Sequence, residues 1–335
     1  MGSSKSETGA MEPPTLEDIR EAEQTIRPYL DPSPLLPSPA LSQLLGFDVR
    51  IKLESLLPTG SFKIRGGLNL VSHLSSEERN AGIIASSTGN HGQSIAFSGR
   101  RFEANVIIGA PADANPVKVA AMEALGAEVV LHGKDFDEAR EWVEAEAQAK
   151  GYRYIHSANE PRLIAGVGTA ALEATRQAPD ADVFLVPVGG GSGASGYSTV
   201  IRALRPEAEV IGVQSEKAPA FYRSWKEHKM VEMPSSDTFA EGLQTRVPFA
   251  LTMEILWKNL DDLVLVSDEE LAQAVATYLW KAHLIAEGAA AAPLAAAFRY
   301  RDRWQGQHVV LVLTGHNIAE EKLRDLLTGY EPFAT

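Results

Sequence analysis

The stretch IASSTGNHGQS, from Ile84 to Ser94, runs from an apolar pair through small residues to the polar trio Asn90, His91 and Gln93. The segment AGIIA, which leads into it, is typical of a short buried strand, and the segment GQSIAFSGRRF, which overlaps its end, is typical of a helix. A turn of small and polar residues between a strand and a helix indicates a ligand site on an α/β fold.

Strand-like and helix-like segments alternate along most of the chain. VFLVPV (183–188) is apolar at every position and HVVLVL (308–313) at every position after His308, as strands buried on both faces of a sheet are. Helix-like segments of ten or more residues separate most of the strands, which is typical of βαβ units. The sequence therefore predicts an α/β fold with mainly parallel sheets. The other strand-like segments are FDVRIKLES, ANVIIGA, AEVVLHG, YRYIHSA and EVIGVQSE.

Four polar or glycine-rich segments follow strand-like segments directly. They are SSTGNHG after AGIIA, GGGSG after DVFLVPV, QSE after EVIGV, and TGHN after HVVLVL. Ligands of open parallel sheets bind at the carboxyl ends of the strands. We therefore expect these segments to gather around one site.

The composition excludes several classes of protein. The 31 Lys and Arg against 44 Asp and Glu give a net charge of −13, which disfavours duplex nucleic acid and anionic membranes as partners. The absence of cysteine excludes disulfides, thiolate nucleophiles and cysteine-bound zinc. The Ala-rich stretch 282–298 contains Glu287 and Pro293, so no membrane span is expected. A cytoplasmic location is the default, and residues 1–14 resemble an expression remnant or a disordered tail.

The glycine-rich segment VGGGSGASG (Val188–Gly196) predicts an anion site. Glycines between a strand and a helix expose backbone N–H groups, which bind anions together with the helix N-terminus. The segment lacks the GK[ST] of a P-loop and a well-placed acidic residue for a dinucleotide ribose. A plain tight turn is the alternative. The pattern favours a phosphate with no adenine attached.

The segment PTGSFKIRGG (Pro58–Gly67) places Lys63 at the start of a helix-like stretch, after small residues and an aromatic residue. An isolated lysine is usually a solvated surface residue. A desolvated lysine, however, keeps a neutral amine that can form a Schiff base with a carbonyl. For Arg65 we favour a structural role, with a salt bridge or simple exposure as the options. A Schiff-base lysine and a cradle for a lone phosphate together suggest pyridoxal 5′-phosphate.

With these motifs on one chain, the sequence resembles the fold-type II pyridoxal-phosphate-dependent family of serine/threonine dehydratases (threonine ammonia-lyases) and serine racemases. SFKIRGG, SSTGNHGQ, VPVGGGSG, VLTGHN and FAEGLQTRVP match family motifs in order, from about residue 17 to residue 328. The resemblance implies two domains, each with a mainly parallel sheet flanked by helices. Residues 15–65 and 158–330 would form the large cofactor-binding domain, and residues 66–157 a small domain that closes over the substrate. A homodimer is expected.

The resemblance also implies a role for each matching residue. Lys63 would hold the cofactor as a Schiff base and act as general base, and Thr314 would face the pyridine nitrogen. The other cofactor contacts would be Phe62 against the ring, Asn90 at the ring hydroxyl, Glu287 near the ring, and Gly189, Gly190, Gly191, Ser192 and Gly193 at the phosphate. The substrate α-carboxylate would be bound by Ser87, Thr88, Asn90 and His91.

Three of these residues have simpler alternatives. His91 could be a packed loop histidine, Asn90 a turn-former, and Glu287 a capped helix residue outside the Ala-rich packing face.

The implied reaction is β-elimination of water from a hydroxy amino acid such as L-threonine or L-serine, which gives a 2-oxo acid and ammonia. The alternatives are elimination from 3-hydroxyaspartate, phenylserine or an ectoine-derived amino acid, and serine racemisation. Thr88 occupies the position of the racemase serine that acts as acid and base, with a stiffer side chain, so racemisation is less favoured. A non-enzymatic amino-acid-binding or cofactor-binding protein and a nucleotide-binding Rossmann protein are the readings from other classes.

The sequence departs from the family pattern at its divalent-metal site. Gln214 and Ala220 stand where the family has carboxylates, so we expect no metal there, with Glu216 as a weak alternative ligand. His316 replaces a glycine beside Thr314, with no role assigned to it. The chain ends without the regulatory domain of feedback-controlled threonine dehydratases, which favours a stand-alone catabolic enzyme.

Overall fold

The computed structural model describes residues 11–134 and 136–334. The first helix, α1 (Leu16–Ile26), begins at a capping box, in which the Thr15 side chain accepts the Asp18 N–H and the Asp18 carboxylate accepts the Thr15 N–H. Of the expected tail, residues 1–10 lie outside the described residues, and Pro14 is buried.

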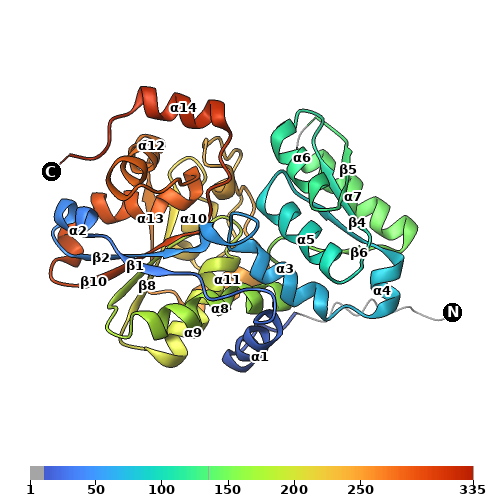
Figure 1. Cartoon of the computed structure of the whole chain (residues 1–335), viewed down its shortest axis with the longest axis horizontal. Coiled ribbons are helices and arrows are strands. Elements are labelled where there is room, and N and C mark those ends of the chain that lie inside the picture. Colours follow the sequence, from blue (N-terminus) through green and yellow to red (C-terminus); the bar gives the residue numbers. More distant parts are fainter. Residues whose placement is uncertain (1–10, 135, 335) are drawn as a thin grey trace.

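A six-stranded sheet organises the larger part of the molecule (Figure 1). All neighbouring strands are parallel except β1, which pairs with β2 in the antiparallel direction. The prediction of a mainly parallel sheet is therefore confirmed. In spatial order the strands are β1 (Leu35–Pro37), β2 (Asp48–Leu53), β10 (His308–Leu313), β7 (Val183–Pro187), β8 (Glu209–Ser215) and β9 (Asp262–Val266).

Helices cover both faces of this sheet, which explains the continuous apolar strands. Along β7, Val183 and Leu185 face one core cluster, whereas Phe184 and Val186 face the other. Full burial of a side chain such as Phe184 stabilises the fold by about 1.5–3 kcal/mol, so the register is strongly determined. The first face carries α2 (Pro39–Leu45), α12 (Asp268–Thr277) and α13 (Gly288–Arg299); the second carries α1, α8 (Pro161–Gln177), α9 (Ser192–Leu204) and α11 (Ala250–Asn259).

A four-stranded, all-parallel sheet forms the second body, to the right in Figure 1. Its strands lie within residues 66–157, the range expected for the smaller domain. In spatial order they are β5 (Glu128–Leu131), β4 (Val106–Ala110), β3 (Ile83–Ser86) and β6 (Arg153–Tyr154). The helices of this part are α3 (Lys63–Ser72), α4 (Ser76–Ala81), α5 (Asn90–Arg101), α6 (Pro116–Ala124) and α7 (Phe136–Lys150).

The two bodies share part of their packing. Leu70 of α3 and Leu163 of α8 belong to the core cluster that also contains Ile83 and Ile108 of the smaller sheet. The remaining helices are α10 (Ala220–Glu227), α14 (Glu320–Gly329), a π-helical turn (Tyr278–Ala282) and three 3₁₀ turns (Glu54–Leu56, Glu241–Leu243, Arg301–Trp304). Over the described ranges, no helix is long and apolar enough to span a bilayer.

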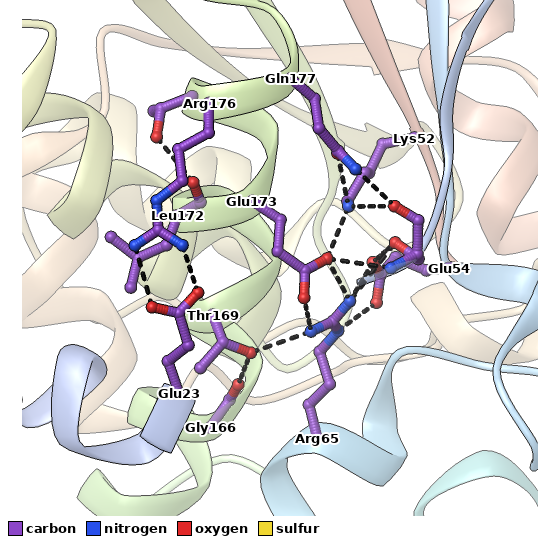
Figure 2. A network of polar contacts seen from close by, with 12 residues as sticks. Glu23, Lys52, Glu54, Arg65, Gly166, Thr169, Leu172, Glu173, Arg176 and Gln177 are labelled. Atoms are coloured by element: carbon purple, nitrogen blue, oxygen red, sulfur yellow. Dashed lines mark hydrogen bonds and ion pairs between the residues drawn. The ribbon is translucent and has the colours of Figure 1, made fainter. Parts of the chain in front are cut away.

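A buried ion network ties α3 to the larger sheet (Figure 2). The Arg65 guanidinium contacts Glu54 through Nε at 2.7 Å and Glu173 through Nη1 at 2.7 Å, and Lys52 Nζ contacts Glu173 at 2.7 Å. Lys52, Glu54 and Arg65 are fully buried. Burial works to lower the pKa of Arg65, but Glu54 and Glu173 outweigh it and hold that pKa above its usual value. The structural role favoured for Arg65 is confirmed.

Candidate active site

The segment before Lys63 is tied to the segment after β10. Phe62 N–H donates to the Thr314 carbonyl at 2.9 Å, and His316 N–H donates to the Gly60 carbonyl at 3.0 Å. Gly60 has φ +68°, and a Cβ there would stand 2.6 Å from His316 Nε2. Only glycine fits this left-handed, crowded position. Lys63, the first residue of α3, therefore has a fixed place beside Thr314.

The Lys63 side chain points toward polar groups of the protein rather than into bulk solvent. Its Nζ lies 3.1 Å from Ser192 Oγ and 3.2 Å from the Ser157 carbonyl oxygen. The Phe62 ring centroid is 5.3 Å away. Burial lowers the pKa of Lys63 to about 8. A large neutral fraction of the amine is therefore present at mildly alkaline pH, as Schiff-base chemistry requires.

The glycine segment forms the turn between β7 and α9. Gly191 has φ +86°, which is a left-handed conformation, and a Cβ on Gly189 would collide with the Gly242 carbonyl. Helix α9 begins at Ser192, and its first N–H groups have no intrahelical acceptor. Together with the helix dipole, they make an anion site within contact of Lys63. The Phe62 ring lies against this turn, 3.2 Å from where a Cβ on Gly193 would stand.

The stretch Ile84–Ser94 runs from β3 through a turn into α5. The Ser87 hydroxyl accepts N–H groups from its own loop, Gly89 N–H at 3.1 Å and Gly92 N–H at 2.8 Å. Ser87 therefore holds the start of α5 as a cap does, which leaves its hydroxyl hydrogen to donate elsewhere. Thr88 and Asn90 are partly exposed beside it, and His91 is buried.

Asn90, Glu287 and Asn317 form a hydrogen-bonded cluster. Asn90 Nδ2 donates to both carboxylate oxygens of Glu287, at 2.8 and 3.1 Å. Asn317 Nδ2 donates to Asn90 Oδ1 at 2.7 Å and to the Thr59 carbonyl at 2.8 Å. These contacts fix which end of the Asn90 amide donates. Asn317 had no predicted role, although it closes the TGHN segment singled out in the sequence.

The Glu287 carboxyl is perturbed by its surroundings. Burial raises its pKa to about 7, against the opposing effects of Asn90 and the Lys118 ammonium, while Glu241 adds to the rise. Glu287 stands at the N-cap of α13 but makes no side-chain capping bond. Its carboxylate faces Asn90 instead.

Two histidines near Lys63 are held neutral. Burial lowers the pKa of His91 to about 3, and its Nδ1 has no hydrogen-bond partner within the described part of the chain. Burial also lowers the pKa of His156 to about 4, and its Nδ1 accepts N–H groups from Ala158 and Asn159 at 3.0 Å each. The His156 proton therefore lies on Nε2. Sequence reasoning missed His156, because it ends an ordinary strand-like run with no motif around it.

The positions expected to lack a metal are occupied by other contacts. The sequence predicts Gln214 after the strand, in the QSE segment, but it lies inside β8. Its Oε1 accepts the Tyr222 N–H at 3.0 Å. Glu216 pairs with Arg299 at 2.7 Å. Within residues 11–134 and 136–334, no group of three or more carboxylates or histidines could hold a metal ion.

Comparison with known proteins places the chain in a family. A family model described as pyridoxal-phosphate dependent enzyme matches residues 26–315. The chain belongs to this family of pyridoxal-phosphate-dependent enzymes. The L-threonine ammonia-lyase of Thermotoga maritima is 40% identical over 304 residues, which cover 91% of this chain and 76% of the relative.

Solved structures of the same family share the fold. Threonine deaminase isoform 2 of Solanum lycopersicum, in its processed form, superposes with a TM-score of 0.88 at 30% identity, over 95% of each chain. Serine racemase of Dictyostelium discoideum superposes with a TM-score of 0.85 at 31% identity, over 91% of this chain and 99% of that one. The fold-type II architecture expected from the sequence is therefore confirmed.

The residues present at the site fit the family's cofactor. Lys63 Nζ contacts Ser192, at the head of the helix whose free N–H groups suit a phosphate. The Asn90 amide is fixed by two neighbours, and buried His91 keeps an unpaired ring nitrogen nearby. A lysine, a phosphate cradle and oriented polar groups in one place are what a phosphorylated aldehyde needs.

The raised pKa of Glu287 predicts a pH-dependent stability. A carboxyl whose pKa is about 7 in the folded protein makes its full contribution to the free energy of unfolding when the pH is below its pKa in the unfolded chain. This contribution is lost as the pH rises through 7. In the cofactor-free protein, Glu287→Gln should therefore be more stable than the parent at pH 8, by about 2 kcal/mol, and no more stable at pH 4. Urea unfolding at the two pH values measures the difference. An equal difference at both would contradict the burial argument.

Proposed function

We propose that the protein is an ammonia-lyase that removes water from a hydroxy amino acid such as L-threonine or L-serine. The hydrolysed products are a 2-oxo acid and ammonia, so L-threonine gives 2-oxobutanoate and L-serine gives pyruvate. The observation that carries this proposal is the desolvated Lys63 amine, 3.1 Å from Ser192 at the glycine-rich start of α9. The names of relatives, among them L-threonine ammonia-lyase and threonine deaminase, support the same class of reaction.

The cofactor would be held by residues of both bodies. Lys63 would attach it, the 189–193 turn would bind its phosphate, Phe62 would pack against the ring, Asn90 and Glu287 would lie at the ring hydroxyl, and Thr314 would face the ring nitrogen. When bound, pyridoxal phosphate supplies the electron sink that makes the α-proton of the amino acid acidic. A threonine hydroxyl is too weak an acid to protonate a ring nitrogen, so Thr314 keeps electron withdrawal moderate. Moderate withdrawal suits elimination, in which a leaving group departs quickly.

Lys63 would move the proton that starts the reaction. Its Nζ has a pKa of about 8, so the neutral amine needed to accept the α-proton is populated near neutral pH. The α-proton and the β-hydroxyl then leave together as water. Donors of the 87–91 turn at the start of α5 would hold the α-carboxylate, helped by the positive end of the helix dipole. Ser87 can donate only its hydroxyl hydrogen, since its oxygen already accepts two N–H groups.

Serine racemase is the second candidate, because solved racemases share the fold. Racemisation needs an acid on the face of the substrate opposite Lys63. Thr88 would be that residue, and its branched side chain has fewer rotamers with which to reach the α-carbon. Elimination needs no such group, so we favour the lyase.

A substrate panel tests the proposal. Purified holoenzyme is incubated with L-threonine, L-serine, 3-hydroxyaspartate, phenylserine and an ectoine-derived hydroxy amino acid, and 2-oxo acid and ammonia are measured. We expect equal amounts of both products, with L-threonine or L-serine as the best substrate. Chiral analysis of serine after incubation detects any D-serine. D-serine formation without 2-oxo acid would make the protein a racemase, and no turnover of any hydroxy amino acid would overturn the proposal.

Three further expectations belong to this function. Residues 66–157 would act as a small domain that closes on the substrate against residues 15–65 and 158–330. The active protein would be a homodimer, which light scattering of the holoenzyme would check. A cytoplasmic location would match the supply of free amino acids.

A further inference from the structure

An ion pair joins the two bodies beside the site. Lys118 belongs to α6, in the body of the four-stranded sheet (Figure 1). Glu241 is the first residue of the 3₁₀ turn Glu241–Leu243, in the larger body. Lys118 Nζ is hydrogen-bonded to Glu241 Oε2. The Lys118 side chain is only 13% exposed, whereas that of Glu241 is 54% exposed. The ammonium is therefore the inner partner and the carboxylate the outer one.

Both partners of this pair lie against segments that form the site. Lys118 Nζ is 4.0 Å from the position that a Cβ on Gly89 would take, which is one residue before Asn90. Gly242, next to Glu241, places its carbonyl against Gly189 of the phosphate turn. The charges of Lys118 and Glu241 both reach the Glu287 carboxyl, with opposite effects on its pKa. The pair thus connects the proposed carboxylate loop with the segment that packs on the glycine turn.

We propose that Glu241 determines substrate specificity by neutralising Lys118, so that the site selects hydroxy amino acids with an uncharged β-substituent. This inference rests on the proposed lyase function. In a β-hydroxy amino acid with a second carboxylate, such as 3-hydroxyaspartate, only the α- and β-carbons separate the two carboxylates. A cation next to the loop that holds the first carboxylate can therefore contact the second.

The charges explain why the pair discriminates. With Glu241 in place, a second carboxylate on the substrate has to displace the Glu241 carboxylate from Lys118. The two negative charges then lie side by side, which is unfavourable in a partly desolvated site. A methyl group or hydrogen at the same position faces no such repulsion. Removing the Glu241 charge alone leaves a poorly solvated ammonium without its partner, and a substrate carboxylate can then take the vacant place.

The test compares kcat/KM for 3-hydroxyaspartate and L-threonine in the holoenzyme. For Glu241→Gln, we expect the ratio of the two values to rise about tenfold or more, because one close charge pair is exchanged for another. Glu241→Ala should give a change in the same direction and is a second route should the amide distort the turn. In the double variant K118M/E241Q, the gain should disappear, because the ammonium that would bind the second carboxylate is gone.

The controls separate this proposal from a general effect of charge. Glu103→Gln makes the same change of net charge at an exposed residue beyond the far end of α5, about 20 Å along the helix from Asn90, and should leave the ratio unchanged. A ratio that moves less than twofold in Glu241→Gln and Glu241→Ala would overturn the proposal, as would a gain that persists in K118M/E241Q. Failure of the parent enzyme on every hydroxy amino acid would instead overturn the proposed function.

Discussion

Lys63→Ala is expected to lose at least about a thousandfold in kcat and all the visible absorbance of a lysine-attached cofactor. The physical reason is that Nζ serves twice, as the point of attachment and as the base for the α-proton. No neighbour can replace it, because the nearby His91 and His156 are held in their own packing and hydrogen bonds. Absorbance spectra and 2-oxo acid production of the purified variant measure the two losses.

The matched control is Lys150→Ala, which removes an exposed ammonium from the last turn of α7 and should leave spectrum and turnover unchanged. Added small primary amines should restore a fraction of the activity of Lys63→Ala, since they supply the missing base. A variant that is folded by circular dichroism and still turns over at the parent rate would remove Lys63 from the mechanism.

Arg65→Met is expected to lower the free energy of unfolding by about 3–5 kcal/mol. The guanidinium is fully buried between Glu54 and Glu173, so its removal leaves two buried carboxylates with Lys52 as the remaining cation that the described ion pairs place beside them. Hydrogen bonds from Arg65 to Ser33 and Thr169 are lost as well. A loss of this size is a large part of the 5–15 kcal/mol that keeps a typical domain folded.

Urea unfolding of Arg65→Met and of Arg324→Met separates this network from an ordinary ion pair. Arg324 is exposed on α14 and pairs only with Glu320 among its described contacts, so its replacement should cost less than about 1 kcal/mol. Adding Glu54→Gln to Arg65→Met should recover part of the loss, because one uncompensated charge disappears. Equal losses in the two single variants would show that the buried network contributes no more than a surface pair.

The network also matters for the site, because Arg65 lies in the first turn of α3, two residues after Lys63. Arg65 contacts Glu54 in the turn after β2 and Glu173 of α8, and Glu173 in turn contacts Lys52 of β2 (Figure 2). These contacts fix the start of α3 relative to the larger sheet. Weakened cofactor retention in Arg65→Met, even under conditions in which it is folded, is therefore expected.

Local patterns were sufficient to predict the fold class and much of the candidate site. The strand β7 is apolar at every position and β10 at every position after His308, which only a sheet covered on both faces explains. The turns after β3, β7 and β10 carry polar or glycine residues, and parallel strands bring their carboxyl ends to one edge of a sheet. These motifs and the family resemblance were sufficient to predict four parts of the candidate site: Lys63, the glycine turn, Asn90 and Glu287.

Other features could be known only from the folded chain, because they join residues far apart in sequence. Asn317 orients Asn90 across 227 positions, Glu173 neutralises Arg65 across 108, and Lys118 meets Glu241 across 123. His156 is neutral because burial lowers its pKa, and the loop after it donates two N–H groups to its ring nitrogen Nδ1. Periodicity and motifs indicate which side of a segment is buried and how its backbone is structured locally. Which distant charge or amide a side chain meets is decided by tertiary packing, and that packing sets the pKa values and the proposed specificity of this site.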